Sequence, residues 1–340
     1  MEFGIALPNC VEGMAYPIRF ADHEAIKRMA QRVEELGYDS VLVNDHYSTM
    51  PYVREAFDEP PRFYEPMVTI TFVAAHTSRV KLMTGVVVMP LREPVLLAKQ
   101  VACIDQISGG RLILGLGIGA YRPEYTSIRP RQADVPRGVL VAEGIEALTR
   151  LFADRRASYE GKYTAFADVE LYPKPLQDPF PIISCGNAPG TITRAATLCA
   201  GWMPAGLPDD RIAAGVVDMR QQAIAAGRDP DNLMVTAQTV LCLDDDMDAA
   251  SARFRNSQVY EHLISLKQST LKGIDVEAYM GQNLIGSPAR IIDRINAIAE
   301  VGVNHLAGLI VVANTEAEFV DQVERFANEV IPAFRPTASG

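Results

Sequence analysis

The sequence has few of the residues from which metal sites and disulfide frameworks are built. It contains one tryptophan, five histidines and five cysteines in 340 residues, and no two cysteines form a C-x-x-C pair. No H-x-H or H-E-x-x-H spacing occurs either. These gaps argue against structural zinc and a hydrolytic metal centre, so we expect no metal ligands. They also favour a reducing compartment in which most thiols are buried.

The chain also lacks an excess of positive charge and a long hydrophobic run. Lys and Arg number 32 against 42 Asp and Glu, which gives a formal net charge of −10, whereas a nucleic-acid surface needs a basic face. No apolar run approaches the roughly 20 residues of a membrane span. The N-terminus begins as an apolar strand without the basic segment of a signal peptide. We therefore expect a cytoplasmic protein that binds neither nucleic acid nor a membrane.

What the sequence does have is a regular alternation of short apolar runs and amphipathic stretches. Near-continuous hydrophobic strands that alternate with helices imply a parallel sheet covered on both faces. Eight such units predict a (β/α)8 TIM barrel, with a doubly wound open sheet as the alternative. The expected strands are 3–8, 40–45, 81–88, 111–117, 181–186, 201–205, 234–243 and 305–312. The expected helices are 24–37, 65–77, 94–107, 137–152, 189–200, 209–226, 288–301 and 315–331.

No linker divides the chain, so we expect residues 1–340 to form one barrel domain with two insertions. Residues of about 155–180 predict a hairpin followed by a Pro-rich loop. Residues of about 244–285 follow the seventh strand and predict an inserted helical excursion. Connections this long inside a compact domain are usually lids or binding loops.

Three glycines alternate at the end of the fourth predicted strand. Gly115, Gly117 and Gly119 lie in "LGLGIG", although a strand interior normally avoids glycine. Gly115, Gly117 and Ala120 match the G-x-G-x-x-G/A dinucleotide fingerprint, but no helical pattern opens directly behind them, as that fingerprint requires. Two interpretations stay open: a rim cleared for a flat or phosphorylated ligand, or tight packing at the end of the barrel.

A histidine and a carboxylate close the second predicted strand. Asp45 and His46 stand in "NDHY", at the end of the barrel where active sites lie. A histidine there can move a proton near neutral pH, and a neighbouring carboxylate can orient it; the plainer interpretation is a rim histidine bonded to a loop. The other histidines, at positions 23, 76, 262 and 305, are interpreted as structural.

Small residues also follow the fifth predicted strand, in "CGNAPGTITRAA". A turn of this kind enters a helix whose N-terminal amides favour an anion, although an ordinary capped turn gives the same pattern. The single tryptophan, Trp202, lies at the sixth strand, where it is suited equally to core filling and to lining a pocket.

Several long segments resemble the luciferase-like monooxygenase superfamily, the bacterial-luciferase-like flavin- and F420-dependent oxidoreductases. They include "RVEELGYDSVLVNDHY", "LREPVLLAKQVACIDQISGGRLILGLGIGAYRPE" and "PIISCGNAPGTITRAATLCAGWMPAG". The second of these segments, the central block, carries the elements R-x-P, AKQ, D-x-I-S-G-G-R and G-x-G-x-G and is highly specific for the family. The resemblance is weakest over 206–285. It implies a (β/α)8 barrel, usually a homodimer, that binds reduced FMN or the deazaflavin F420 at the carboxyl ends of the strands. The DH pair and the "GNAP" segment favour the F420-dependent actinobacterial branch.

The resemblance also implies which residues form the site. It gives His46 the proton-handling role and places Tyr47 and Trp202 in the substrate pocket. A non-proline cis peptide is implied at Val86–Val87, behind the central ring of the cofactor. The implied cofactor-binding residues are Asp45, Val86, Val87, Gly117, Gly186 and Asn187.

One departure from the family pattern concerns the acid behind the strand-four glycines. The sugar-phosphate dehydrogenases of the F420 branch carry a catalytic glutamate where this chain has Ile118 or Gly119. Glu124 lies further along and is interpreted as holding the loop. This departure argues against sugar-phosphate oxidation.

The leading functional hypothesis is therefore an oxidoreductase that uses reduced F420 for hydride transfer to or from a small organic substrate. The first alternative is a two-component FMN-dependent monooxygenase that uses O2 and reduced FMN from a separate reductase. The second alternative is a non-catalytic flavin-binding barrel. The substrate itself is not predicted, because the insertions that would select it are where the resemblance is poorest and fold does not fix function.

Overall fold

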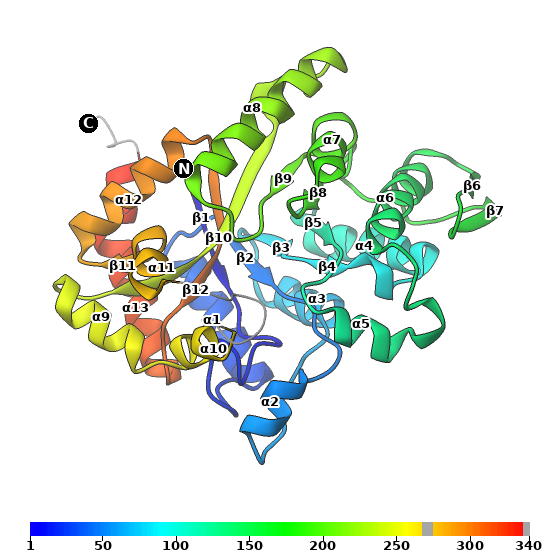
Figure 1. Cartoon of the computed structure of the whole chain (residues 1–340). Coiled ribbons are helices and arrows are strands. Elements are labelled where there is room, and N and C mark those ends of the chain that lie inside the picture. Colours follow the sequence, from blue (N-terminus) through cyan, green and yellow to red (C-terminus); the bar gives the residue numbers. More distant parts are fainter. Residues whose placement is uncertain (267–274, 336–340) are drawn as a thin grey trace.

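Strands from both ends of the chain pair to close a barrel in the computed structural model, which describes residues 1–266 and 275–335. Within these residues the strands are β1 Glu2–Ala6, β2 Ser40–Val43, β3 Lys81–Thr84, β4 Val87–Val88, β5 Leu112–Gly117, β6 Ala157–Glu160, β7 Ala165–Val169, β8 Ile182–Cys185, β9 Gly201–Met203, β10 Met234–Leu243, β11 Leu284–Gly286 and β12 His305–Val311. Parallel pairing runs β1-β2-β3-β5-β8-β9-β10-β12 and returns from β12 to β1. The predicted (β/α)8 barrel is confirmed for the described part of the chain (Figure 1).

Helices surround the barrel on its outside (Figure 1). In the described residues they are α1 His23–Glu35, α2 Pro51–Ala56, α3 Pro66–His76, α4 Pro94–Ser108, α5 Arg122–Ile128, α6 Arg137–Ala153, α7 Pro189–Thr197, α8 Asp209–Ala225, α9 Met247–Arg255, α10 Gln258–Leu266, α11 Val276–Gln282, α12 Pro288–Glu300 and α13 Glu316–Glu329. Helix α1 illustrates how the sequence forms them. Asp22 caps its N-terminus by accepting from the amide of Ala25, and Ile26, Met29 and Val33 face the core. None of the helices described is long and apolar enough to span a bilayer.

The strands alternate their side chains between two apolar layers. One layer fills the barrel itself, and its buried members include Leu42, Met83 and Ile183. The other lies between the barrel and the helices and is much larger. This division follows from the two-residue period of a strand that is covered on both faces.

The D-x-I-S-G-G-R motif of the central block is structural. The carboxylate of Asp105 is fully buried and accepts hydrogen bonds from the amides of Leu176 and Gln177. The guanidinium of Arg111 donates to the carbonyl oxygens of Ala74 and Val80. The two side chains therefore tie neighbouring loops to the ends of α4 and β5.

The third predicted strand, 81–88, is interrupted. It divides into β3 and β4, and the break contains a cis peptide between Gly85 and Val86. The implied cis bond at Val86–Val87 was therefore placed one residue too late. The interruption makes a bulge of residues 85–88, and its second part, β4, pairs with β5.

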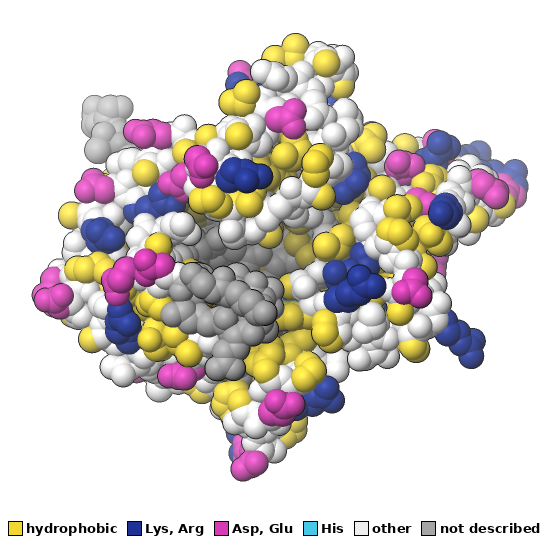
Figure 2. Space-filling model, in the orientation of Figure 1, with side chains coloured by type: hydrophobic (Ala, Val, Ile, Leu, Met, Phe, Trp, Pro, Cys, Tyr) yellow, Lys and Arg dark blue, Asp and Glu magenta, His cyan; other side chains and the backbone are white. Residues whose placement is uncertain are grey.

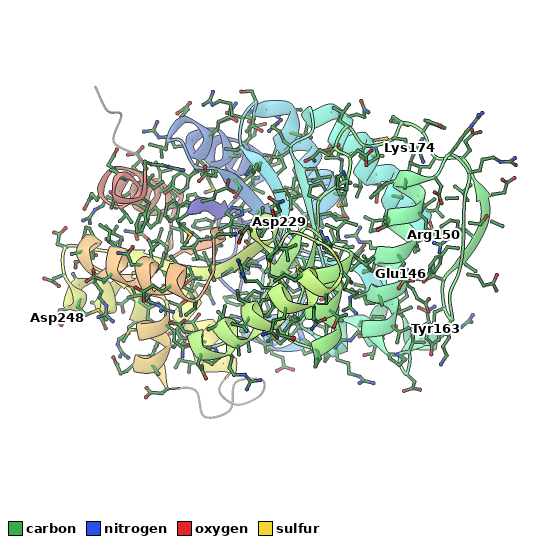
Figure 3. All side chains as sticks on the ribbon, turned by 90° about the horizontal axis from the view of Figure 1, so that it is seen from above. Glu146, Arg150, Tyr163, Lys174, Asp229 and Asp248 are labelled. Atoms are coloured by element: carbon green, nitrogen blue, oxygen red, sulfur yellow. The ribbon has the colours of Figure 1, made fainter. Side chains whose placement is uncertain are left out.

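Two insertions lie outside the regular alternation. The β6–β7 hairpin packs beside α6, where the phenol of Tyr159 donates to Glu146; Figure 3 labels Glu146 and Arg150 on α6 and Tyr163 at the hairpin's turn. The excursion after β10 contains α9, α10 and α11 and returns through β11. It has a small core of its own, with Phe254, Leu263 and Met280 among its buried members.

Candidate active site

A cavity of about 390 Å³ opens at the carboxyl ends of β1, β2, β10 and β12. This is the end of a (β/α)8 barrel at which active sites lie. Figure 2 views this side of the molecule, where hydrophobic side chains border a hollow in the face. The polar side chains on its described wall are Asn44, His46, Gln238 and His262. The rest of that wall is mostly apolar or aromatic.

His46 is held by a carboxylate from another part of the chain. Its Nδ1 lies 3.2 Å from Oε2 of Glu124, which is in the first turn of α5. The second oxygen of Glu124 accepts from the amides of Tyr47 at 2.6 Å and Ser48 at 3.0 Å. Glu124 therefore holds the loop after β2, as the sequence suggested, and also contacts the imidazole.

The environment of Glu124 keeps it ionised. Burial by itself would raise the pKa of this carboxyl group, but the interactions with His46 and the two amides outweigh burial and lower it. A carboxylate at Nδ1 favours the imidazole form that carries its proton there. The other ring nitrogen, Nε2, is then left to accept or donate a proton at the cavity.

Asp45 is 4% exposed and faces the bulge rather than solvent. Its Oδ2 accepts from the amide of Val88 at 2.8 Å and from Arg92 at 2.9 Å. Arg92 also bonds to Glu65. Burial raises the pKa of Asp45 above its ordinary value, although Arg92 opposes the shift. Oδ1 has no partner among the described residues, so it is the oxygen with which Asp45 could accept a hydrogen bond from a ligand.

The three glycines of β5 and the loop behind it face the bulge. A Cβ on Gly115 would collide with the carbonyl oxygen of Thr84. A Cβ on Gly117 would lie 3.0 Å from Val86, and one on Gly119 would lie 2.9 Å from Val88. These contacts support close strand packing as the reason for the glycines. Gly117 and Val86 meet directly, so they would shape a cofactor site together.

The start of α7 offers groups that suit an anion. Gly190 lies in its first turn, where helix amides have no intrahelical acceptor. The Nε of Arg194 is buried and has no partner in the described chain, and burial lowers the pKa of this guanidinium. Its Nη1 lies 3.3 Å from where a Cβ of Gly190 would stand. A phosphate group therefore fits the chemistry of these residues.

Gly186 and Asn187 have backbone and amide partners of their own. The side chain of Asn187 donates to the carbonyl oxygen of Ala205 at 2.7 Å and accepts from its amide at 2.9 Å. Gly186 has φ of +122°, a value that favours glycine, and its carbonyl accepts from the indole of Trp202. Both residues thus fix the turn between β8 and α7.

Neither the two predicted substrate-pocket residues nor the six predicted cofactor-binding residues are among the residues that line the cavity. Trp202 is fully buried in the core and packs against Gly215, so it fills space instead of lining the pocket. Tyr47 is 42% exposed, with the guanidinium of Arg92 4.8 Å from the centre of its ring. Strand position alone could not distinguish an inward from an outward side chain at the short strand β9.

His262, which the sequence led us to interpret as structural, instead lines the cavity. It lies on α10 of the second insertion, and its Nδ1 is 3.2 Å from the hydroxyl of Tyr52 in α2. Burial lowers the pKa of His262 to about 4, so the ring is neutral near pH 7. No spacing in the sequence connects position 52 with position 262, and only the fold reveals the pair.

Comparisons with known proteins agree with this architecture. The profile of the luciferase-like monooxygenase family matches residues 1–305. An F420-dependent glucose-6-phosphate dehydrogenase of Kineococcus radiotolerans is 25% identical over 322 residues, covering 90% of this chain and 92% of that one. An FMNH2-dependent dimethylsulfone monooxygenase of Pseudomonas putida is 28% identical over 334 residues, covering 91% and 87%.

Solved structures share the fold at lower identity. The monooxygenase RslO1 of Streptomyces bottropensis has a TM-score of 0.81 at 23% identity, and the match covers 98% of this chain and 100% of that one. An F420-dependent secondary alcohol dehydrogenase, solved with an F420–acetone adduct, has a TM-score of 0.77 at 18% identity and coverage of 98% and 99%. Both kinds of cofactor therefore occur among the proteins that this chain is similar to.

Proposed function

Because the chain belongs to the luciferase-like monooxygenase family and is therefore a flavin- or deazaflavin-dependent oxidoreductase, we propose that its cofactor is reduced F420. The reaction is hydride transfer to or from a small organic substrate, with His46 handling the proton. The observation that carries this proposal is the His46–Glu124 pair at the wall of the cavity.

The predicted cofactor-binding residues are not among those that line the cavity, but their chemistry fits a flavin-type cofactor. The bulge would hold the ring through Val86, which packs against Gly117, and through the backbone of Val87, whose side chain is buried in the outer core. Oδ1 of Asp45 would accept from the ring. The backbone of Gly186 and Asn187, with Gly190 and Arg194 at the start of α7, would hold the phosphate. When bound, the reduced cofactor supplies a hydride.

The chain's own part in the reaction is to position the substrate and move a proton. Glu124 fixes the imidazole of His46 through Nδ1 and leaves Nε2 free to act. Nε2–H donates to the substrate oxygen or nitrogen in the reducing direction, and unprotonated Nε2 accepts that proton in the oxidising direction. Much of the cavity wall is apolar, and a substrate that displaces water from it would strengthen both contacts.

Two cofactor titrations test the choice of F420. We expect oxidised F420 to bind at least about tenfold more tightly than oxidised FMN, which corresponds to about 1.4 kcal/mol. Parallel fluorescence titrations in one buffer measure both affinities. Equal affinities, or tighter binding of FMN, would contradict the proposal.

The alternative is a two-component monooxygenase that takes reduced FMN from a separate reductase and uses O2. The dimethylsulfone monooxygenase relative, at 28% identity, favours it. Oxygen consumption with reduced FMN would support this alternative. Anaerobic, substrate-dependent oxidation of reduced F420, or reduction of oxidised F420, would support the leading proposal.

We further propose that the protein is a homodimer joined through α3 and α4. The outer faces of these helices border an apolar groove of about 570 Å³ that includes Phe72 and Cys103. Val68, Leu96 and Ile107 are 68%, 59% and 58% exposed. A helix that is apolar on its inner and outer faces is normally buried on both, and a second copy would present the same self-complementary surface.

We also propose a cytoplasmic location. All five cysteines are free thiols, which supports it.

A further inference from the structure

The cavity wall carries no Asp, Glu, Lys or Arg side chain among the residues that the structure describes. Its members include hydrocarbon side chains such as Leu7, Met14 and Ile310 and the aromatic rings of Tyr16 and Tyr279. The volume of about 390 Å³ lies within the range of small-molecule sites. A charged substrate group would lose its hydration here with no Asp, Glu, Lys or Arg of the described wall to pair with it, and a protonated His46 is already paired with Glu124. The described wall thus favours a neutral, mostly apolar molecule.

A row of aromatic rings connects two imidazoles across this wall. The ring of His46 is 5.6 Å from that of Tyr121, and Tyr121 is 6.4 Å from Tyr52. Tyr52 stacks with His262 at 5.5 Å and an interplanar angle of 27°. The rings fix one another's positions, so the two histidines stand in a defined relation on the same cavity.

The hydrogen bond between Tyr52 and His262 determines what His262 can offer. Burial raises the pKa of the Tyr52 phenol, so that hydroxyl keeps its proton. Its contact with Nδ1 of His262, at 3.2 Å, is shorter than its contact with the hydroxyl of Tyr121, at 3.5 Å. A phenol that donates to Nδ1 leaves the neutral imidazole with its proton on Nε2. His262 is thereby prepared as a hydrogen-bond donor.

We propose that the cavity takes a neutral, largely apolar substrate with one oxygen acceptor, and that His262, set by Tyr52, donates a hydrogen bond to that substrate. His46 contacts the reacting atom, whereas His262 is a positioning and specificity residue supplied by the second insertion. This inference rests on the proposed function for the reaction. The ligand binding that it describes involves only residues of the protein and needs no cofactor.

Binding of small probes to the protein without cofactor tests the inference. Cyclohexanone is the neutral acceptor, methylenecyclohexane has its shape without the oxygen, and cyclohexanecarboxylate and glucose 6-phosphate are the anions. Ligand-observed NMR gives each dissociation constant. We expect cyclohexanone to bind more tightly than the hydrocarbon by about three- to tenfold, the range of one neutral hydrogen bond, and more tightly than either anion.

Three variants and one control test whether Tyr52 and His262 cause the preference for cyclohexanone over the hydrocarbon. His262→Phe and Tyr52→Phe should remove most of the threefold to tenfold advantage, and His262→Gln should restore part of it. Glu261→Gln, an exposed neighbour on α10, should leave it unchanged. The ¹⁵N spectra of labelled histidine should show the proton of His262 on Nε2, and Tyr52→Phe should remove this tautomer preference. The ¹⁵N resonances of His262 should shift when cyclohexanone binds, whereas those of a merely structural histidine would not.

The outcomes separate this inference from the cofactor proposal. The inference is overturned if cyclohexanone does not bind, if either anion binds more tightly, or if folded His262→Phe retains the wild-type preference. Should His262→Phe fail to fold, Tyr52→Phe and the nitrogen shifts decide in its place. If cyclohexanone binds through His262 but neither F420 nor FMN binds, the proposed function is wrong and this inference stands. If F420 binds but cyclohexanone does not bind through His262, this inference is wrong and the proposed function stands.

Discussion

His46 and Glu124 are 78 positions apart, and their contact sets the direction in which the imidazole can act. Glu124 is fixed by two backbone amides, so its carboxylate cannot follow the ring if the ring turns. The imidazole is therefore held with Nδ1 on the carboxylate. This arrangement gives a single side chain a defined chemical role that its identity alone does not confer.

The first prediction concerns this pair. His46→Ala should lower kcat by about 10²–10⁴-fold, the usual contribution of a general acid or base, with much less change in cofactor affinity. Glu124→Gln should lower kcat less, because it loosens the ring without removing it. Steady-state kinetics and cofactor titration measure both. The double variant should be no slower than His46→Ala, and a loss equal to the product of the two single losses would mean that the residues act independently.

The second prediction concerns acid stability. His262 has a pKa of about 4 in the fold against about 6.5 when unfolded, so the unfolded chain binds more protons between these values. The free energy of unfolding should therefore decrease as pH falls from about 6.5 to about 4. In His262→Gln this decrease should be smaller by about 2 kcal/mol, measured by urea denaturation at several pH values.

His305 provides the reference for that experiment. Its pKa is also lowered to about 4, by burial, and it remains in both proteins. The difference between the two pH profiles therefore reports His262 alone. Parallel profiles for wild type and His262→Gln would show that burial does not restrain protonation of this ring.

The interrupted third strand illustrates how one element shapes its neighbour. Residues 85–88 bulge towards β5, and β5 accommodates them with glycines where side chains would collide. Gln238 of β10 adds a hydrogen bond of 2.8 Å from its side chain to the carbonyl oxygen of Gly85. The bulge is thus held from both sides, next to the cavity that Gln238 lines.

The third prediction tests this packing. Gly115→Ala should destabilise the protein by about 1–3 kcal/mol, because the new methyl group has no space beside Thr84. Gly138→Ala is the matched control in α6, where nothing lies within 4 Å, and it should stabilise the protein by up to about 0.5–1 kcal/mol. Thermal and urea unfolding measure both changes. If Gly115→Ala left the free energy of unfolding unchanged, β3 and β5 would have to move apart at no cost, which would contradict this packing argument.

The assembled barrel buries one face of each outer helix and leaves α3 and α4 with a second apolar face. The groove between them shares no described lining residue with the cavity. Loss of the proposed dimer should therefore not alter the cavity directly. This separation allows assembly and ligand binding to be tested independently.

The fourth prediction concerns that interface. The double variant Val68→Glu and Ile107→Glu should convert the homodimer into a monomer in sedimentation or light-scattering measurements, because like charges would meet across a two-fold interface. The double variant Val217→Glu and Ile224→Glu, at residues of α8 that are 55% and 63% exposed, should leave the dimer intact. A wild-type monomer at micromolar concentration would contradict the dimer proposal.

The sequence by itself determined the barrel, because each element carries a local signal of its own. Alternating apolar runs and amphipathic helices predicted strands such as 40–45 and helices such as 94–107 within a few residues of their observed ends. The same local signal identified Asp45 and His46 at the end of a strand. The local pattern did not show the division of 81–88 into β3 and β4, since Val86, Val87 and Val88 form an unbroken apolar run. Only the family resemblance implied an irregularity there, one residue away from the observed cis bond.

Only the tertiary structure decided which distant side chains meet. The contacts of His46 with Glu124 and of Tyr52 with His262 span 78 and 210 positions, and no periodicity encodes such distances. Burial of Trp202 likewise depends on which face of β9 turns to the helices. Local patterns fix elements because neighbours in sequence are neighbours in space. A site at the mouth of a barrel joins loops that are far apart in the chain, so its chemistry is set by the way the elements close upon one another.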